Sequence, residues 1–405
     1  MQATAGAPRR EVQVVGLVSF AHLLSHVYMF ALVPLYPQIT RTLGIGFTEI
    51  GIAATVLAAF TGGFQTPMGL LVDRIGGRNV LIGGLLVNAV AIALVGFVTS
   101  FWQLLGLMAL AGLGASVFHP ADYSILSAMA EEKRLGRVFS MHTMGGQIGS
   151  ASAVPVIVAL EFLLDWRAAL IIVGVVGVVL ALVMLACSRV IGAGGHAKKK
   201  NKGPSAWRRL ATSPSVMLFF VFYVGSSAGN AGIIHFSVTA YSTMYDLPVV
   251  VTAIALTVYQ VMNMLLVLPG GMLADRVKNT EMVLGVCFGA GAVLVVIAGL
   301  GTLPFWLAVC VLGTAGALRG LVNASRDVSV RHAAGEGISV ATVFAFVSTG
   351  FSLGQMMGPT LYGWLIDTGS PQSVFWVSAG FSVMSLVAML IGQLVKPRTA
   401  GAVAE

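Results

Sequence analysis

The sequence predicts an all-α membrane protein whose twelve transmembrane helices form two six-helix bundles related by pseudo-symmetry. Three observations predict this class: an extreme hydrophobic composition, a series of apolar stretches that could each cross a bilayer, and an internal repeat. Of 405 residues, 57% are hydrophobic and 9% are charged, whereas soluble domains carry about 25% charged residues. A bilayer therefore suits most of the surface of this chain better than water does.

Twelve apolar stretches account for most of the chain. A helix needs roughly 20 mostly apolar residues to cross a bilayer, and each stretch is at least that long. Little sequence is left for a separate soluble or catalytic domain. The stretches are 13–39, 48–71, 79–99, 102–128, 138–162, 166–188, 214–241, 249–273, 281–301, 305–329, 339–364 and 373–395.

The net charge of +8 indicates membrane topology rather than nucleic-acid binding. Of 23 Lys and Arg residues, all but Arg41, Arg167 and Arg319 lie on or near the same side of the predicted membrane. The positive-inside rule makes the basic side cytoplasmic, so we expect both termini and the run Lys198–Lys200 there. Anchoring of topology is the favoured role of that run, and binding of RNA or anionic lipid is the alternative. A bacterial inner membrane is the expected location.

The chain repeats itself at an offset near 204 residues, which indicates duplication of a six-helix unit. It therefore divides into an N-terminal bundle at 1–189, a polar cytoplasmic linker at 190–213 and a C-terminal bundle at 214–405. Two such halves suit a carrier that rocks around a central site. The matches are Phe101-Trp102 with Phe305-Trp306, Asp73-Arg74 with Asp275-Arg276, Asp122 with Asp327, and Pro155 with Pro359.

A polar pattern, G-x-x-x-D-R-x-G-x-R, begins at Gly69 between the second and third stretches, and a shorter copy begins at Gly271 after the eighth. Its aspartates lie where carboxylates can pair with arginines at the membrane edge and hold one conformation closed. The pattern resembles the signature loop of the major facilitator superfamily, and this resemblance implies the major facilitator fold. The charged residues of the first copy are expected to form a cluster with charged residues of the C-terminal bundle or with Asp122. The predicted gate residues are Asp73, Arg74, Arg78, Asp122, Asp275, Arg276 and Asp327.

A narrower resemblance lies in the first and fourth stretches. The pentapeptide from His22 to His26, followed by Tyr36-Pro37, resembles the first helix of the fosmidomycin-resistance family of efflux carriers. The tetrapeptide Val117–Pro120 resembles that family's fourth helix. The family tends to carry an acidic residue where this chain has His26, and an arginine where it has Ser124.

Ionisable residues inside a membrane are expensive, so each is a functional candidate. His22 and His26 are four residues apart and share a helix face. Because histidine titrates near physiological pH, we expect His26 and His119 to carry a coupling proton. Purely structural hydrogen bonds are the alternative for these residues. His142 and His235 lie near helix ends and are expected at the membrane interface.

Arg319 lies in a stretch that is otherwise Leu, Gly, Ala and Val. An arginine stays charged and needs a partner. It either reaches Asp327 or Asp122, or it meets an anionic substrate. A few polar groups in an apolar pocket are typical of small-molecule sites. The predicted substrate-binding residues are Arg319, His26, His22, Asn230, Gln260 and Asn263.

These observations predict a secondary active transporter. It would move a small organic anion across the inner membrane by alternating access, coupled to protons. A proton-driven multidrug exporter and a lipid flippase are the alternatives. The sequence offers no metal-ligand cluster, nucleophile motif or phosphate loop, so we expect neither an enzyme nor a cofactor. The expected partners are the substrate, protons and the bilayer, without nucleic acid, and the protein is expected to be a monomer.

Overall fold

Every regular element in the described part of the chain is a helix, as the sequence predicted. The structure, a computed structural model, describes residues 7–131, 134–194, 210–277, 279–323, 325–326 and 340–395. The helices are α1 (Ala7–Phe30), η1 (Val33–Leu35), α2 (Tyr36–Leu43), α3 (Phe47–Ile75), α4 (Gly77–Val95), α5 (Phe101–Ala115), α6 (Phe118–Met129), α7 (Leu135–Leu163), α8 (Trp166–Ala186), α9 (Ser188–Ile191), α11 (Pro214–Tyr245), α12 (Val249–Arg276), α13 (Thr280–Ala298), α14 (Phe305–Leu321), α16 (Val340–Asp367) and α17 (Ser373–Val395).

Most of these helices have the length and composition of membrane spans. Within the described ranges, ten segments are long and apolar enough to cross a bilayer, and Phe305–Leu321 is a shorter apolar helix. The prediction of an all-α, multi-pass membrane protein is therefore confirmed, whereas the count of twelve helices stays a prediction.

Prolines explain why two of these segments are not single straight helices. The segment Arg10–Leu43 changes to a short 3-10 turn at Val33–Leu35, beside Pro34 and Pro37. In the segment Phe101–Met129, α5 ends before Pro120 and α6 starts two residues before it. Proline has no N–H to donate and is tolerated mainly in the first turn of a helix, so it marks such breaks.

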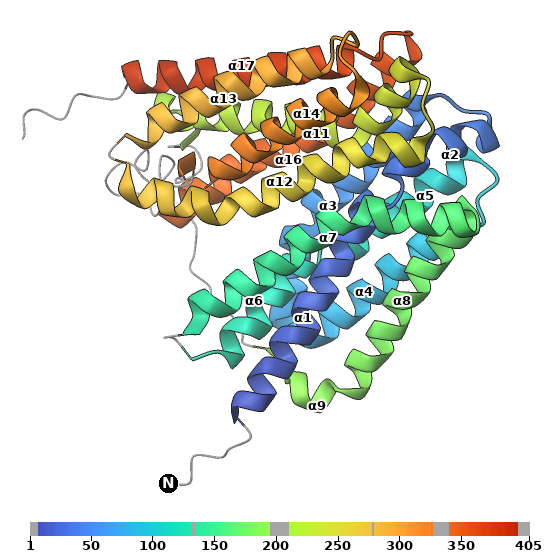
Figure 1. The fold of residues 1–405 in the computed structure, drawn as a ribbon. Helices are drawn as coiled ribbons and strands as arrows, with labels where there is room; N and C mark the ends of the chain where they lie inside the picture. Colours follow the sequence, from blue (N-terminus) through green and yellow to red (C-terminus); the bar gives the residue numbers. More distant parts are fainter. Residues whose placement is uncertain are drawn as a thin grey trace, which may run out of the picture.

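The helices gather in two groups, which Figure 1 shows by colour. The first group, α1–α9, is held by packing of α1 against α7, of α4 against α5 and α8, and of α3 against α5. The second group, α11–α17, is held by packing of α11 against α16 and α17, and of α12 against α14. The two groups meet mainly where α3 packs on α16 and α7 packs on α12.

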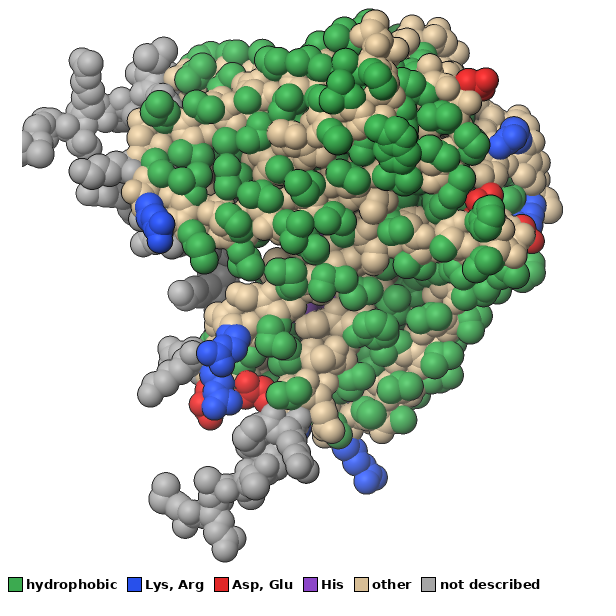
Figure 2. Space-filling model, in the orientation of Figure 1, with side chains coloured by type: hydrophobic (Ala, Val, Ile, Leu, Met, Phe, Trp, Pro, Cys, Tyr) green, Lys and Arg blue, Asp and Glu red, His purple; other side chains and the backbone are tan. Residues whose placement is uncertain are grey.

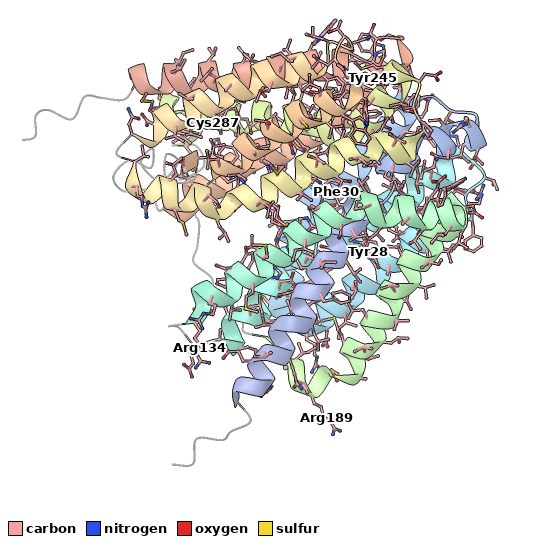
Figure 3. All side chains as sticks on the ribbon, viewed as in Figure 1. Tyr28, Phe30, Arg134, Arg189, Tyr245 and Cys287 are labelled. Carbon is pink, nitrogen blue, oxygen red and sulfur yellow. The ribbon has the colours of Figure 1, made fainter. Side chains whose placement is uncertain are left out.

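The surface matches a bilayer environment. Figure 2 shows apolar side chains over most of the visible face, with Lys, Arg, Asp and Glu at its two ends. Some of these apolar side chains are large and very exposed, such as Trp102 and Phe162, each at 75%. Figure 3 places Arg134 and Arg189 near one end of the molecule and Tyr245 near the other. We call these the basic end and the opposite end.

Candidate functional site

At the opposite end, an aspartate of the second group caps a helix of the first. Asp367 is the last residue of α16, and its carboxylate accepts hydrogen bonds from the backbone N–H groups of Phe47 (2.9 Å) and Thr48 (2.7 Å). The Thr48 hydroxyl donates to the same carboxylate at 2.5 Å. The first N–H groups of a helix have no partner inside it, so Asp367 supplies the missing acceptors of α3 from across the boundary.

Two further hydrogen bonds join the groups deeper in the molecule. Tyr36 Oη lies 2.9 Å from His235 Nδ1, and both side chains are buried. The Thr55 hydroxyl donates to the Met356 carbonyl at 2.7 Å. The α3–α16 contact is also unusually close, because a Cβ on Gly51 would overlap the backbone at Pro359. The two groups are therefore tightly joined on this side.

Toward the basic end the surface is hollowed between the two groups, as Figure 2 shows. A histidine side chain, drawn in purple, is visible at the inner end of this hollow. Among the described histidines, His119 is exposed and His26 is partly exposed.

The predicted gate residues of the first copy lie at the basic end. Arg78 donates from Nη1 to the Ser188 carbonyl at 2.9 Å, which ties α4 to α9 within the first group. Asp73 is half-buried and Arg74 is exposed. In the second copy Arg276 is exposed, whereas the Asp275 side chain and all of Asp327 lie outside the described residues.

Among the described residues, Asp122 lies within ion-pair distance of histidines and not of Arg74 or Arg78. It is fully buried inside the first group, between two histidines. Asp122 Oδ2 lies 3.5 Å from His22 Nδ1 and 3.5 Å from His142 Nε2. The His22 and His142 rings stack with centroids 4.0 Å apart. Helices α1, α6 and α7 thus bring one carboxylate and two imidazoles together, and we call His22, Asp122 and His142 the buried triad.

The two predicted proton-coupling residues flank the buried triad. The His26 ring lies 4.8 Å from the His22 ring, and His26 Nδ1 lies 2.8 Å from the Ser150 hydroxyl. The His119 ring lies 5.5 Å from the His22 ring. The structure therefore brings the α1 and α6 histidines together as one cluster, while their coupling role stays a prediction.

His142 and His235, expected at the membrane interface because they lie near helix ends, are both buried within the protein, and their depth in the membrane stays a prediction. Their exposed fractions are 1% and 8%. His142 is covered because α6 and α1 pack over the first turns of α7. His235 is covered because Phe30 at the end of α1 and Tyr36 at the start of α2 pack against its ring. The position of these histidines near helix ends in the sequence could not predict which residues cover them.

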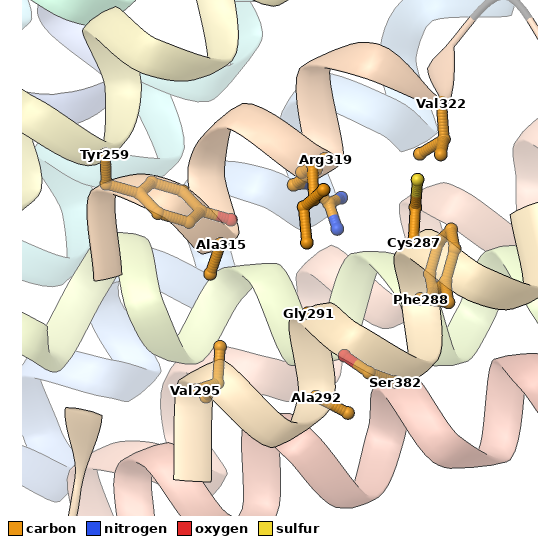
Figure 4. Close-up of a pocket in the computed structure, with 11 residues that line it drawn as sticks. Tyr259, Cys287, Phe288, Gly291, Ala292, Val295, Ala315, Arg319, Val322 and Ser382 are labelled. Carbon is orange, nitrogen blue, oxygen red and sulfur yellow. The ribbon is translucent and has the colours of Figure 1, made fainter. Parts of the chain in front are cut away.

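Arg319 lies inside the second group. Its Nη2 donates to the Ser226 carbonyl on α11 at 3.2 Å. It borders a cavity that Tyr259, Cys287 and Ser382 also line, as Figure 4 shows. The cavity volume is about 40 Å³, which is enough for water molecules but not for an organic acid. Arg319 forms no ion pair with any described carboxylate.

The other predicted substrate residues lie on α11 and α12. Asn230 accepts a hydrogen bond from the Tyr259 hydroxyl at 2.8 Å. Gln260 donates to the Ser150 carbonyl of α7 at 3.2 Å, so it joins the two groups. The backbone of Asn263 lies against Gly320, at one of several close approaches of α12 and α14. The described contacts connect neither Asn263 nor Arg319 to His22 or His26.

A multi-pass helical fold that is tightly joined at one end and hollowed at the other is the arrangement found in membrane carriers. The family model of the Major Facilitator Superfamily matches residues 18–344, so the chain belongs to the major facilitator superfamily. It is not an enzyme, as the sequence predicted. A bacterial homologue of the human lysosomal transporter Spinster, solved in an inward-facing conformation, shares the fold. Its TM-score is 0.76, with 15% identity over 95% of each chain.

Three curated relatives are also similar. The probable L-galactonate transporter of Escherichia coli is 28% identical over 41% of this chain and 37% of its own length. The fosmidomycin resistance protein of the same bacterium is 27% identical over 35% of each chain, which agrees with the resemblance in the first and fourth stretches. The probable sulfoacetate transporter SauU of Cupriavidus necator is 23% identical over 94% of each chain. The chain thus spans little more than a third of the first two relatives.

Proposed function

We propose that this protein is a secondary transporter that moves a small organic anion across a bacterial inner membrane by alternating access. One observation carries the proposal: the two helix groups are tightly joined at the opposite end and separated by a hollow at the basic end. A carrier caught with one side closed and the other open has this arrangement. In this proposal the α1–α9 and α11–α17 groups are two six-helix bundles, and twelve helices cross the membrane.

The orientation of the protein follows from its charges. Arg134 and Arg189 lie at the basic end, and the lysine-rich segment at 198–202 is expected on the same side. The positive-inside rule favours a cytoplasmic position for this end. The closed end would then face the periplasm, and the conformation would be inward-facing. Both termini and the linker 190–213 are proposed to be cytoplasmic.

Two observations support an anionic substrate. The names of two relatives specify acids, L-galactonate and sulfoacetate. In the second group, Arg319 is a half-buried cation inside the predicted membrane span, with no described carboxylate partner, so its charge can favour an anion nearby. Its cavity is too small for such a substrate in this conformation, so binding would require movement of α13 or α14. Protons remain the predicted coupling ion.

Uptake into proteoliposomes tests the proposal. Vesicles with purified protein would be offered L-galactonate, sulfoacetate and the cation methyl viologen, each with and without a pH gradient. We expect uptake of at least one acid above that of empty vesicles, and no uptake of the cation. Uptake of the cation alone would instead support the multidrug exporter; a methyl viologen resistance protein of Salmonella typhimurium is 33% identical over 23% of this chain.

A further inference from the structure

The buried triad is the most unusual polar feature of the described residues. The exposed fractions of His22, Asp122 and His142 are 5%, 0% and 1%. His22 Nδ1, both carboxylate oxygens of Asp122 and both ring nitrogens of His142 are buried without a hydrogen-bond partner. Buried polar groups are normally hydrogen-bonded, and a lone buried carboxylate is especially costly. Five unpartnered polar atoms at one point indicate that a ligand belongs between them.

The spacing of these atoms identifies the kind of ligand. A direct charge-assisted hydrogen bond between imidazole and carboxylate would be about 2.7–2.9 Å long, but Asp122 Oδ2 lies 3.5 Å from each histidine nitrogen. Zinc holds nitrogen and oxygen ligands at about 2.0–2.2 Å, so two ligands of a tetrahedral zinc lie roughly 3.3–3.5 Å apart. The two pairs that involve Asp122 Oδ2 have this spacing. The three ligand atoms together lie within 4.8 Å of one another, so binding of the ion would draw the two imidazole nitrogens closer together.

We propose that the buried triad binds a divalent transition-metal ion of the zinc type. The ligands are His22 Nδ1, His142 Nε2 and a carboxylate oxygen of Asp122. Two imidazoles and one carboxylate suit zinc, cobalt and iron, whereas calcium and magnesium prefer sets made only of oxygen. Three protein ligands leave one tetrahedral position open for water or another small ligand.

The surroundings of the triad give the ion a route and a function. His119 and Tyr123 have exposed side chains on α6, and the Tyr123 ring lies 6.0 Å from the His142 ring. These are the exposed side chains nearest to the triad on α6, so the proposal places the entry of the ion beside them. Once bound, it would link α1, α6 and α7 within the first group, and it would leave His26 and His119 outside the coordination set. Binding to the folded state alone raises its stability.

Cobalt binding to the purified protein tests this inference without any transport assay. The full-length protein would carry an affinity tag without histidine, be stripped with a chelator, and be titrated with Co²⁺ in detergent. We expect one equivalent of Co²⁺ with the visible absorption of a tetrahedral site, and its displacement by Zn²⁺. A wild-type protein that binds no Co²⁺ in this way would overturn the inference, whatever it transports.

Two variants and one control localise the ion. His142→Phe keeps a ring stacked on His22 but removes the nitrogen ligand, so affinity should fall by more than about tenfold, since even an outer partner of a ligand is worth about 10–100-fold. His235→Gln removes a buried histidine outside the triad and should bind Co²⁺ like wild type. Equal affinity of folded His142→Phe and wild type would overturn the assignment.

His142→Cys covers the case in which His142→Phe does not fold. A thiolate is a good ligand for zinc and cobalt, so this variant should still bind one Co²⁺ and gain a sulfur-to-cobalt absorption band. That band would place residue 142 in the coordination sphere. A folded His142→Cys protein that binds Co²⁺ without the band would exclude residue 142 as a ligand and overturn the proposed site.

Discussion

Asp367 caps helix α3 through Thr48, whose backbone N–H and hydroxyl both donate to one carboxylate oxygen, at 2.7 and 2.5 Å. The two residues belong to different helix groups, and 319 positions separate them in sequence. A carboxylate at a helix N-terminus is also favoured by the helix dipole. This contact must break if the opposite end opens, so in the proposed transport cycle we expect it to act as a latch on one conformation.

Replacing Asp367 should therefore favour the state in which the opposite end is open. Loss of a helix cap costs about 0.5–2 kcal/mol, which corresponds to a shift of about 2- to 30-fold in the ratio of the two states. Spin labels on Thr42→Cys and Ser370→Cys, in a background without the three native cysteines, would report the distance across this end. Asp367→Ala should increase the long-distance fraction.

Asp165→Ala is the matched control for this latch. Asp165 also caps a helix, because it accepts hydrogen bonds from the N–H groups of Arg167 (2.7 Å) and Ala168 (2.8 Å). Both partners belong to the first group, so its loss should leave the distance distribution unchanged. Equal distributions for Asp367→Ala and Asp165→Ala would show that Asp367 is an ordinary cap.

Tyr36→Phe tests the second connection between the groups. The substitution removes the hydrogen bond to His235 but keeps the ring, and one hydrogen bond contributes about 0.5–1.5 kcal/mol. We expect a smaller shift of the same distance distribution toward the open state. Tyr28→Phe is its control, because Tyr28 donates to the Val173 carbonyl within the first group. A shift of the same size in Tyr28→Phe would contradict this account.

Gly51→Ala should separate α3 from α16. The added methyl group would overlap the backbone at Pro359, and overpacking of this kind costs about 1–3 kcal/mol. We expect a lower unfolding temperature together with a larger open fraction at the opposite end. Gly63→Ala on the same helix meets no atom within 4 Å and should change neither quantity.

Arg319 tests the charge of the substrate. Arg319→Lys keeps the charge but loses the planar fork that binds a carboxylate through two hydrogen bonds, so KM for the transported acid should rise. Arg319→Ala should raise it further. Arg41→Ala removes an exposed arginine at the opposite end and should have no such effect. Normal transport of the acid by Arg319→Ala would make Arg319 a structural residue.

The helices could be predicted from the sequence because the membrane requires long apolar segments. The expected stretch 373–395 coincides with α17 (Ser373–Val395), and 48–71 lies within α3 (Phe47–Ile75). The stretch 13–39 was less accurate, because Pro34 and Pro37 divide that span into α1, a short turn and α2. Apolar composition shows where a span lies but not where its backbone bends.

The buried triad could not be predicted because its residues are distant in sequence. His22 was recognised as an intramembrane candidate and Asp122 as a gate residue, but nothing in the spacing of positions 22, 122 and 142 indicates that they meet. Only the packing of α1, α6 and α7 brings them together. The contact between Asp367 and Thr48 could not be predicted either. The two residues are distant in sequence, and polar residues are common at helix ends.

Alternating access itself can be measured with two label pairs in one experiment. The pair Thr42→Cys and Ser370→Cys reports the opposite end, and Ser140→Cys with Met272→Cys reports the basic end. Adding a transported acid, or introducing Asp367→Ala, should lengthen the first distance and shorten the second. Two distances that change in the same direction, or that both stay constant during active transport, would contradict a carrier that opens to one side at a time.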